Sequence, residues 1–118
     1  MPSREAQRLV REMDSLVETV EEVRTILRFY GKVSAEVAKR VDKGQRLADV
    51  LDSLHGPLRR QQVTDAVEAL EAARHRVRLA MFALASTQDT SAAELGRQLG
   101  FSRQLASRLA QEAEDAFG

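Results

Sequence analysis

The chain has no cysteine and no tryptophan, only two prolines, and aromatic side chains make up 4% of its 118 residues. Without cysteine, neither disulfide bonds nor cysteine-ligated zinc can form. Threonine, aromatic and alternating polar–apolar patterns are scarce, which argues against strands. No apolar run reaches the length of a membrane span, and no charged start followed by an apolar centre marks a signal peptide. These absences predict a soluble, cytoplasmic protein.

The residue types that are abundant in the chain favour helices. Hydrophobic residues make up 43% of the chain and charged residues 31%, a balance typical of a globular protein of one domain. Alanine, leucine, glutamate, arginine and glutamine are abundant, and all of them favour helix. We therefore expect an all-α fold, a helical bundle with two long helices. Within residues 1–118, residues 1–88 form a helical scaffold and residues 89–118 a separate motif.

Glycine and proline predict where the helices end. The expected helices run from Ser3 to about Phe29, ending at Gly31; from Ser34 to Lys43, ending at Gly44; from Gln45 to His55, closed by Gly56 and Pro57; and from Leu58 to Ser86. Together with the C-terminal motif, this gives five or six helices.

Residues 91–109 have the pattern of two short helices joined by a tight turn. Ser91 followed by Glu94 is a capping box, which predicts a helix that starts at Ala92. Gly100 ends that helix, because glycine adopts the left-handed conformation of a helix C-terminus at little cost. Ser102 is the next N-cap, so a second helix follows at once.

The two faces of these helices differ in chemistry. The predicted inward residues are apolar: Leu95, Leu99, Phe101, Leu105, Ala106 and Leu109. Gly96 has no side chain, which lets the second helix cross closely. The predicted outward residues of the second helix are Arg103, Gln104, Ser107, Arg108 and Gln111. Arginine fits guanine bidentately, glutamine fits adenine, and serine binds phosphate.

The segment resembles the helix-turn-helix of bacterial transcriptional regulators and of region four of sigma factors, over about 20 of the 118 residues. The resemblance implies that the helix at 102–116 lies in the major groove of double-stranded DNA, usually as a two-fold dimer. It assigns base or phosphate contacts to Arg103, Gln104, Ser107 and Arg108. Ala106 departs from the pattern, because a branched aliphatic residue is common there. An ordinary helical hairpin with a glycine turn is the alternative.

Charge is unevenly distributed although the net charge is zero. Residues 74–108 contain six arginines and two carboxylates, a local excess of four positive charges. Arg74 and Arg78 share one helical face and could bind phosphate. A solvated face paired with Glu68 and Glu71 fits that pair equally well. The full set of candidate DNA contacts is Ser91, Arg97, Ser102, Arg103, Gln104, Ser107, Arg108, Arg74 and Arg78.

Both long helices carry a heptad pattern, in which apolar residues alternate at spacings of three and four. In the first helix these residues are Leu9, Met13, Leu16, Val20, Val23, Leu27 and Tyr30. In the second they are Val63, Ala66, Leu70, Ala73, Val77, Ala80 and Leu84. The two helices could pair within one chain or across two chains, and the sequence does not choose. We expect a homodimer, with the first helix from Leu9 to Leu27 as its interface, because a single short motif makes few DNA contacts.

Residues 35–51 align with residues 93–109 when the chain is shifted by about 58 positions. They could form a second, degenerate helix-turn-helix within 34–51, with Gln45, Arg46 and Asp49 outward. Asp49 facing phosphate is unfavourable, and helical periodicity alone produces many such matches. Two helices of similar amphipathic pattern are therefore the preferred interpretation.

No pattern in the chain predicts catalysis. His55 and His75 have no neighbours at metal-ligand spacing, and there is no glycine-rich phosphate loop or activated nucleophile. We expect no enzyme activity, no metal and no cofactor. The predicted function is sequence-specific DNA binding by a nucleoid-associated regulator of transcription. The alternative from another class is a helical interaction module, an adaptor or antitoxin-like protein.

Overall fold

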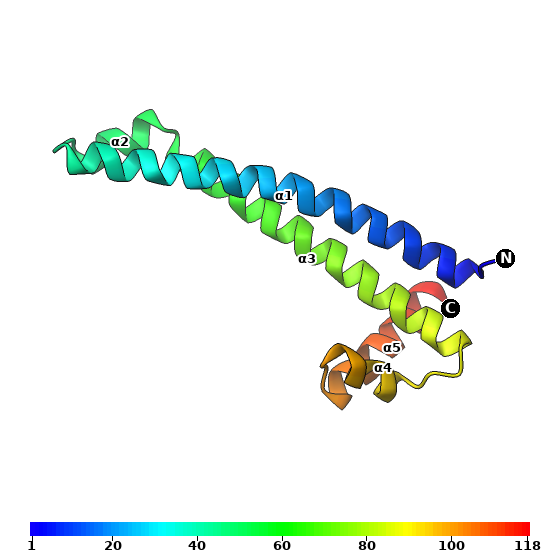
Figure 1. Cartoon of the computed structure of the whole chain (residues 1–118). Helices are drawn as coiled ribbons and strands as arrows, with labels where there is room; N and C mark the ends of the chain where they lie inside the picture. The colour runs from blue at the N-terminus through cyan, green and yellow to red at the C-terminus, as the bar shows by residue number, and fades with distance from the viewer. The chain divides into compact units, whose positions relative to one another are not determined.

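The computed structural model describes all 118 residues and is all-α, with 86% of the chain in helices and no strand (Figure 1). The five helices are α1 (Arg4–Asp42), α2 (Leu47–Ser53), α3 (Gly56–Thr87), α4 (Ala92–Leu99) and α5 (Arg103–Phe117). The predicted fold class is confirmed.

The chain divides into two compact units, and both long helices contribute to each. The first unit contains residues 1–17 and 72–118, and the second contains residues 18–71. The motif at 89–118 therefore shares its unit with one end of α1 and one end of α3.

Within each unit, a stretch of α1 packs against a stretch of α3. In the first unit, Arg76 Nε of α3 donates to a carboxylate oxygen of Glu12 on α1 at 3.0 Å. In the second unit, the Arg59 guanidinium of α3 lies 4.8 Å from the ring centre of Phe29 on α1. The long helices therefore pair within one chain, which is one of the two arrangements that the sequence left open.

Helix α1 continues through Gly31 to Asp42, so the predicted end at Gly31 is wrong. A mid-helix glycine costs only about 1 kcal/mol relative to alanine, which packing readily outweighs. Val33 and Val37, just beyond Gly31, are half-buried and extend the inward face of α1. Ser34, predicted to begin a new helix, donates its hydroxyl to the Tyr30 carbonyl one turn earlier at 2.9 Å.

The other boundaries of the scaffold lie within about two residues of their predicted positions, as is common for helix ends. Helix α3 begins at Gly56 and takes Pro57 into its first turn, where the missing N–H has no helical partner to lose. Helix α2 has only seven residues. Asp89, with φ of 56°, lies in the connection between α3 and α4.

Most of the buried apolar core belongs to the first unit. It holds nine of the eleven buried hydrophobic side chains, and the second unit holds only Val23 and Val50. The predicted apolar seam of α3 is confirmed, because each of its seven members is buried or half-buried. Alanines at alternate positions of this seam, such as Ala73 and Ala80, permit close helix approach.

Candidate nucleic-acid interface

Helix α4 begins where the sequence predicts, at Ala92. The Ser91 hydroxyl accepts the N–H of Glu94 at 3.1 Å, which satisfies one of the free donors at the start of the helix. Ser91 has extended backbone angles, as an N-cap residue should. The cap therefore fixes the point at which the motif leaves the preceding connection.

The turn between α4 and α5 takes only residues 100–102. Gly100 has a φ of 78°, its N–H donates to the Arg97 carbonyl at 3.2 Å, and the Phe101 N–H donates to the Gly96 carbonyl at 2.7 Å. This pair of bonds is a Schellman motif, which closes a helix C-terminus. The Ser102 hydroxyl then accepts the Leu105 N–H at 3.1 Å and caps α5.

Helices α4 and α5 approach most closely at Gly96 and Ala106. A Cβ atom built on Gly96 would lie 2.5 Å from the Ala106 Cβ, which is too short for a real contact. Gly96 is buried, and Ala106 is only 1% exposed. The small residue at 106 thus pairs with a glycine across the helix crossing.

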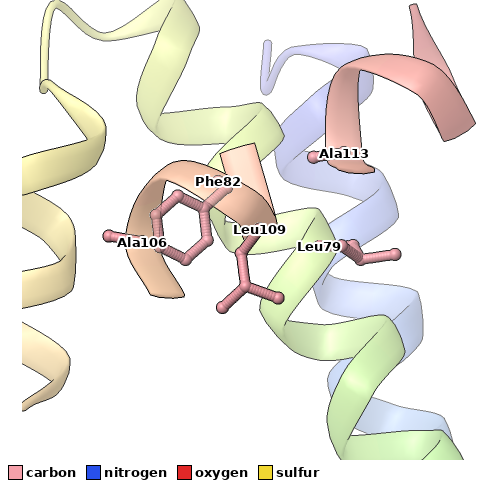
Figure 2. Packing of buried hydrophobic residues seen from close by; sticks show 5 residues of the cluster. All are labelled: Leu79, Phe82, Ala106, Leu109 and Ala113. Carbon is pink, nitrogen blue, oxygen red and sulfur yellow. The ribbon is translucent and has the colours of Figure 1, made fainter. Parts of the chain in front are cut away.

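The inward face of α5 packs on the C-terminal end of α3 (Figure 2). Ala106, Leu109 and Ala113 form one buried cluster with Leu79 and Phe82 of α3. Leu95, Leu99, Phe101 and Leu105 surround the cluster, as predicted for the inward residues of the motif. Burial of Leu79 and Phe82 was not predicted. Residues 79–85 are apolar throughout, however, and a helix that is apolar on all sides is buried on all sides.

The outward face of α5 is open to solvent. Ser102, Arg103, Gln104, Ser107 and Arg108 are all exposed, and so are Ser91 and Arg97 on the α4 side. Neither Arg97, Arg103 nor Arg108 forms an ion pair within the chain. The guanidinium groups on this face are therefore not held by a carboxylate of the chain.

A shallow cavity of about 540 Å³ lies between the first residues of α4 and α5. Ser91, Arg97 and Arg103 line it, together with Glu94 and Phe101. The structure thus brings two helix starts and two unpaired guanidinium groups to one concave surface. Free backbone N–H groups and the helix dipole make such starts favourable positions for an anion.

The two upstream arginines have different surroundings. The Arg78 guanidinium lies 5.4 Å from the ring centre of Phe101, so this half-buried side chain packs against the turn of the motif. Arg74, one turn earlier on α3, is exposed.

Two contacts that the sequence did not predict fasten α5 to the long helices of its unit. His75 Nε2 of α3 lies 2.9 Å from a carboxylate oxygen of Glu112. The Arg8 guanidinium of α1 lies 4.0 Å from the ring centre of Phe117. Both pairs combine residues distant in sequence, so no local pattern could have revealed them. They hold the C-terminal half of α5 against both long helices of the unit.

The predicted dimer residues of α1 divide into two sets. Leu9 and Leu16 are half-buried and Val23 is buried, so this set packs within the chain. Met13, Val20 and Leu27 are each more than a third exposed. Val10 and Val17, which flank the predicted seam, are more exposed still.

Residues 34–51 do not reproduce the C-terminal motif in detail. Gly44, with φ of 88°, closes α1 by the same pair of backbone bonds that Gly100 makes. Arg46, at the N-cap of α2, makes no side-chain cap and lies 3.9 Å from Asp49. Gln45 and Arg46 therefore precede the helix instead of lying on its outward face.

No group of three or more histidine, cysteine or acidic side chains is placed to hold a metal ion. His55, with φ of 56°, lies between α2 and α3 in the second unit, and His75 lies in the first. None of the helices is both long and apolar enough to cross a membrane.

In comparison with known proteins, no protein-family model, no curated protein and no solved structure matches the chain.

Proposed function

We propose that the chain is a sequence-specific double-stranded DNA-binding protein, a transcriptional regulator that acts as a dimer and places α5 in the major groove. The observation that carries this proposal is the outward face of α5. Arg103 and Arg108 are exposed there without ion pairs, while Ala106 and Leu109 on the opposite face are buried. A helix anchored on one side and cationic on the other suits a groove lined by phosphates.

Each outward side chain has a chemical role in this arrangement. Arg103 and Arg108 offer bidentate donors to guanine, and Gln104 offers the matching pair to adenine. Ser91, Ser102 and Arg97 surround the helix starts, where phosphate contacts fix the orientation of a protein on the duplex. Base reading and phosphate binding are thus divided between α5 and the surface beside it.

The exposed apolar residues of α1 support the dimer. Met13, Val20 and Leu27 recur seven residues apart, and each is more than a third exposed. A regular row of this kind indicates a partner helix. A second copy of the chain supplies one and also doubles the number of DNA contacts, which a short motif needs for affinity.

The test begins with selection of bound duplexes from a random library. Affinity for a selected duplex is then measured by fluorescence anisotropy over a series of salt concentrations. We expect steep weakening as salt rises, because each neutralised phosphate releases a counterion. Absence of duplex binding even at low salt would favour the adaptor or antitoxin-like alternative, in which the exposed residues of the motif and of α1 contact another protein.

Replacing Arg103 by alanine should weaken binding to the selected site by about 1–3 kcal/mol and relax the preference at one base pair. Arg11→Ala is the matched control, since Arg11 is an exposed arginine on α1 outside the candidate interface. Its affinity and base preference should equal those of the parent chain. If Arg103→Ala behaves like Arg11→Ala, Arg103 contacts no base and the assignment is wrong.

A further inference from the structure

A second cavity lies in the other unit, among α1, α2 and α3. It measures about 410 Å³, within the range of small-molecule sites. Val33 and Val37 of α1 form one wall, and Leu51 and Leu54 at the end of α2 form another. None of the lining residues belongs to the candidate nucleic-acid interface.

The surface around this cavity is apolar and uncovered. Of the residues that line the cavity, Tyr30 and Leu51 are each more than 40% exposed, and Val33, Val37 and Leu54 are half-buried. Apolar side chains that line a cavity and remain exposed indicate a binding surface. This surface therefore suits the apolar part of a ligand.

Arg59 and Arg60 also line the cavity, and no acidic residue does. Arg59 donates from Nε to the Leu54 carbonyl at 3.4 Å and from Nη1 to Gln62 at 3.2 Å. Arg60 is exposed and forms no hydrogen bond or ion pair within the chain. Two positive charges thus lie at an apolar cavity without a carboxylate to balance them.

Two carboxylates of this unit, Glu36 and Asp65, are hydrogen-bonded to other side chains. Glu36 accepts from Arg40 Nε at 2.8 Å, a hydrogen bond that holds the pKa of this carboxyl below its usual value. Asp65 accepts from the side-chain amide of Gln61 at 2.8 Å. Neither Arg59 nor Arg60 forms an ion pair with a carboxylate of the chain.

We propose that this cavity binds an amphipathic carboxylate of medium chain length. The alkyl chain lies against Val33, Val37 and Leu51, and the carboxylate pairs with Arg60, with Arg59 beside it. A bidentate guanidinium–carboxylate pair is a strong hydrogen-bonded arrangement, and an alkyl chain suits the apolar walls. This inference does not depend on DNA binding.

The probe is decanoate, held below its micelle concentration, and the reporter is Tyr30. Tyr30 lines the cavity and is the only tyrosine of a chain without tryptophan, so its fluorescence reports this site alone. We expect a saturable change in Tyr30 emission with decanoate. Affinity should rise about fourfold for each methylene added between octanoate and dodecanoate, which corresponds to burial of the alkyl chain.

Headgroup specificity is tested with decyl sulfate, decanol and decyltrimethylammonium. Decanoate and decyl sulfate, the two anions, should bind more tightly than decanol. Decyltrimethylammonium, the cation, should bind most weakly. Arg60→Gln should weaken decanoate at least about tenfold and leave decanol unchanged. Arg11→Gln, which removes an equal charge away from the cavity, should bind decanoate like the parent chain.

Three outcomes would overturn the proposal. The first is no saturable response to decanoate, and the second is equal binding of the cationic amphiphile. The third is undiminished decanoate binding by an Arg60→Gln chain whose helicity by circular dichroism matches that of the parent. Binding of an acidic helical peptide without any binding of decanoate would also reject the small-molecule site and identify the surface as a protein-docking site.

Discussion

At the scale of single residues, the crossing of α4 and α5 depends on the absence of one methyl group. The space that a Gly96 side chain would need is occupied by Ala106, which is itself buried. Because both helices are also held at the turn by Gly100 and Phe101, they have little freedom to move apart. The outward residues of α5 therefore keep their position only while residue 96 remains glycine.

Gly96→Ala should destabilise the chain by about 1–3 kcal/mol, the usual cost of overpacking a core, and weaken DNA binding as α5 shifts. Gly31→Ala is the matched control, because a Cβ there meets nothing within 4 Å and Gly31 lies inside α1. Gly31→Ala should raise the free energy of unfolding by about 0.5–1 kcal/mol. Denaturant unfolding of both variants measures the two effects. Equal stability of the two alanine variants would contradict the close approach.

At the scale of helices, the two faces of α1 distinguish intramolecular packing from the proposed dimer. Leu16 and Val17 are adjacent, yet Leu16 is half-buried within the first unit and Val17 is 62% exposed. A charge at Leu16 must enter the half-buried packing of α1 within the chain, whereas a charge at Val17 meets only what lies outside. Substitutions at these two positions therefore test intramolecular packing and the proposed dimerisation separately.

Val17→Lys should convert the dimer to a monomer with unchanged helicity, because a buried charge at a dimer interface is costly while one in water is not. Leu16→Arg should lower the melting temperature whatever the oligomeric state. Sedimentation equilibrium and circular dichroism measure mass and folding. A parent chain that stays monomeric at every concentration, or a Val17→Lys chain of unaltered dimeric mass, would refute this interface.

The helices also show how far the sequence could predict the structure. The caps at Ser91 and Ser102 and the turn at Gly100 were predictable, since each depends on residues within one turn of helix. The end of α1 was not, because the half-buried Val33 and Val37 continue the inward face of the helix past Gly31, whose local preference does not end it. Periodicity likewise identified the α1 seam, but it could not predict that Leu16 is half-buried and Met13 exposed. The two residues differ only in whether another part of the chain lies against them.

At the scale of the whole molecule, the two units differ in how much apolar side chain they bury. The first unit has a cluster around Phe82 and Leu109, whereas the second has only Val23 and Val50 fully inside. Local stability follows buried apolar contact, so the units should open with different free energies. The unit that carries the candidate nucleic-acid interface should be the more stable one.

Hydrogen exchange followed by mass spectrometry tests this difference. After correction for intrinsic rates, amides in residues 77–85 and 106–113 should exchange most slowly, and those in 47–71 much faster. Addition of decanoate should slow the second group if it occupies the cavity. Uniform protection of both groups in the free chain would contradict unequal stability.

The cap of α5 leaves one atom of the motif with an unused capacity. The Ser102 hydroxyl oxygen accepts the Leu105 N–H, but its own proton takes no part in that bond. One side chain can therefore begin the helix and donate to a phosphate oxygen at the same time. Aspartate caps a helix as well as serine does but has no proton to donate and carries a negative charge. A chain with aspartate at this position would fold normally and be repelled by DNA, so in the proposed function a single hydroxyl group serves both the fold and the contact with phosphate.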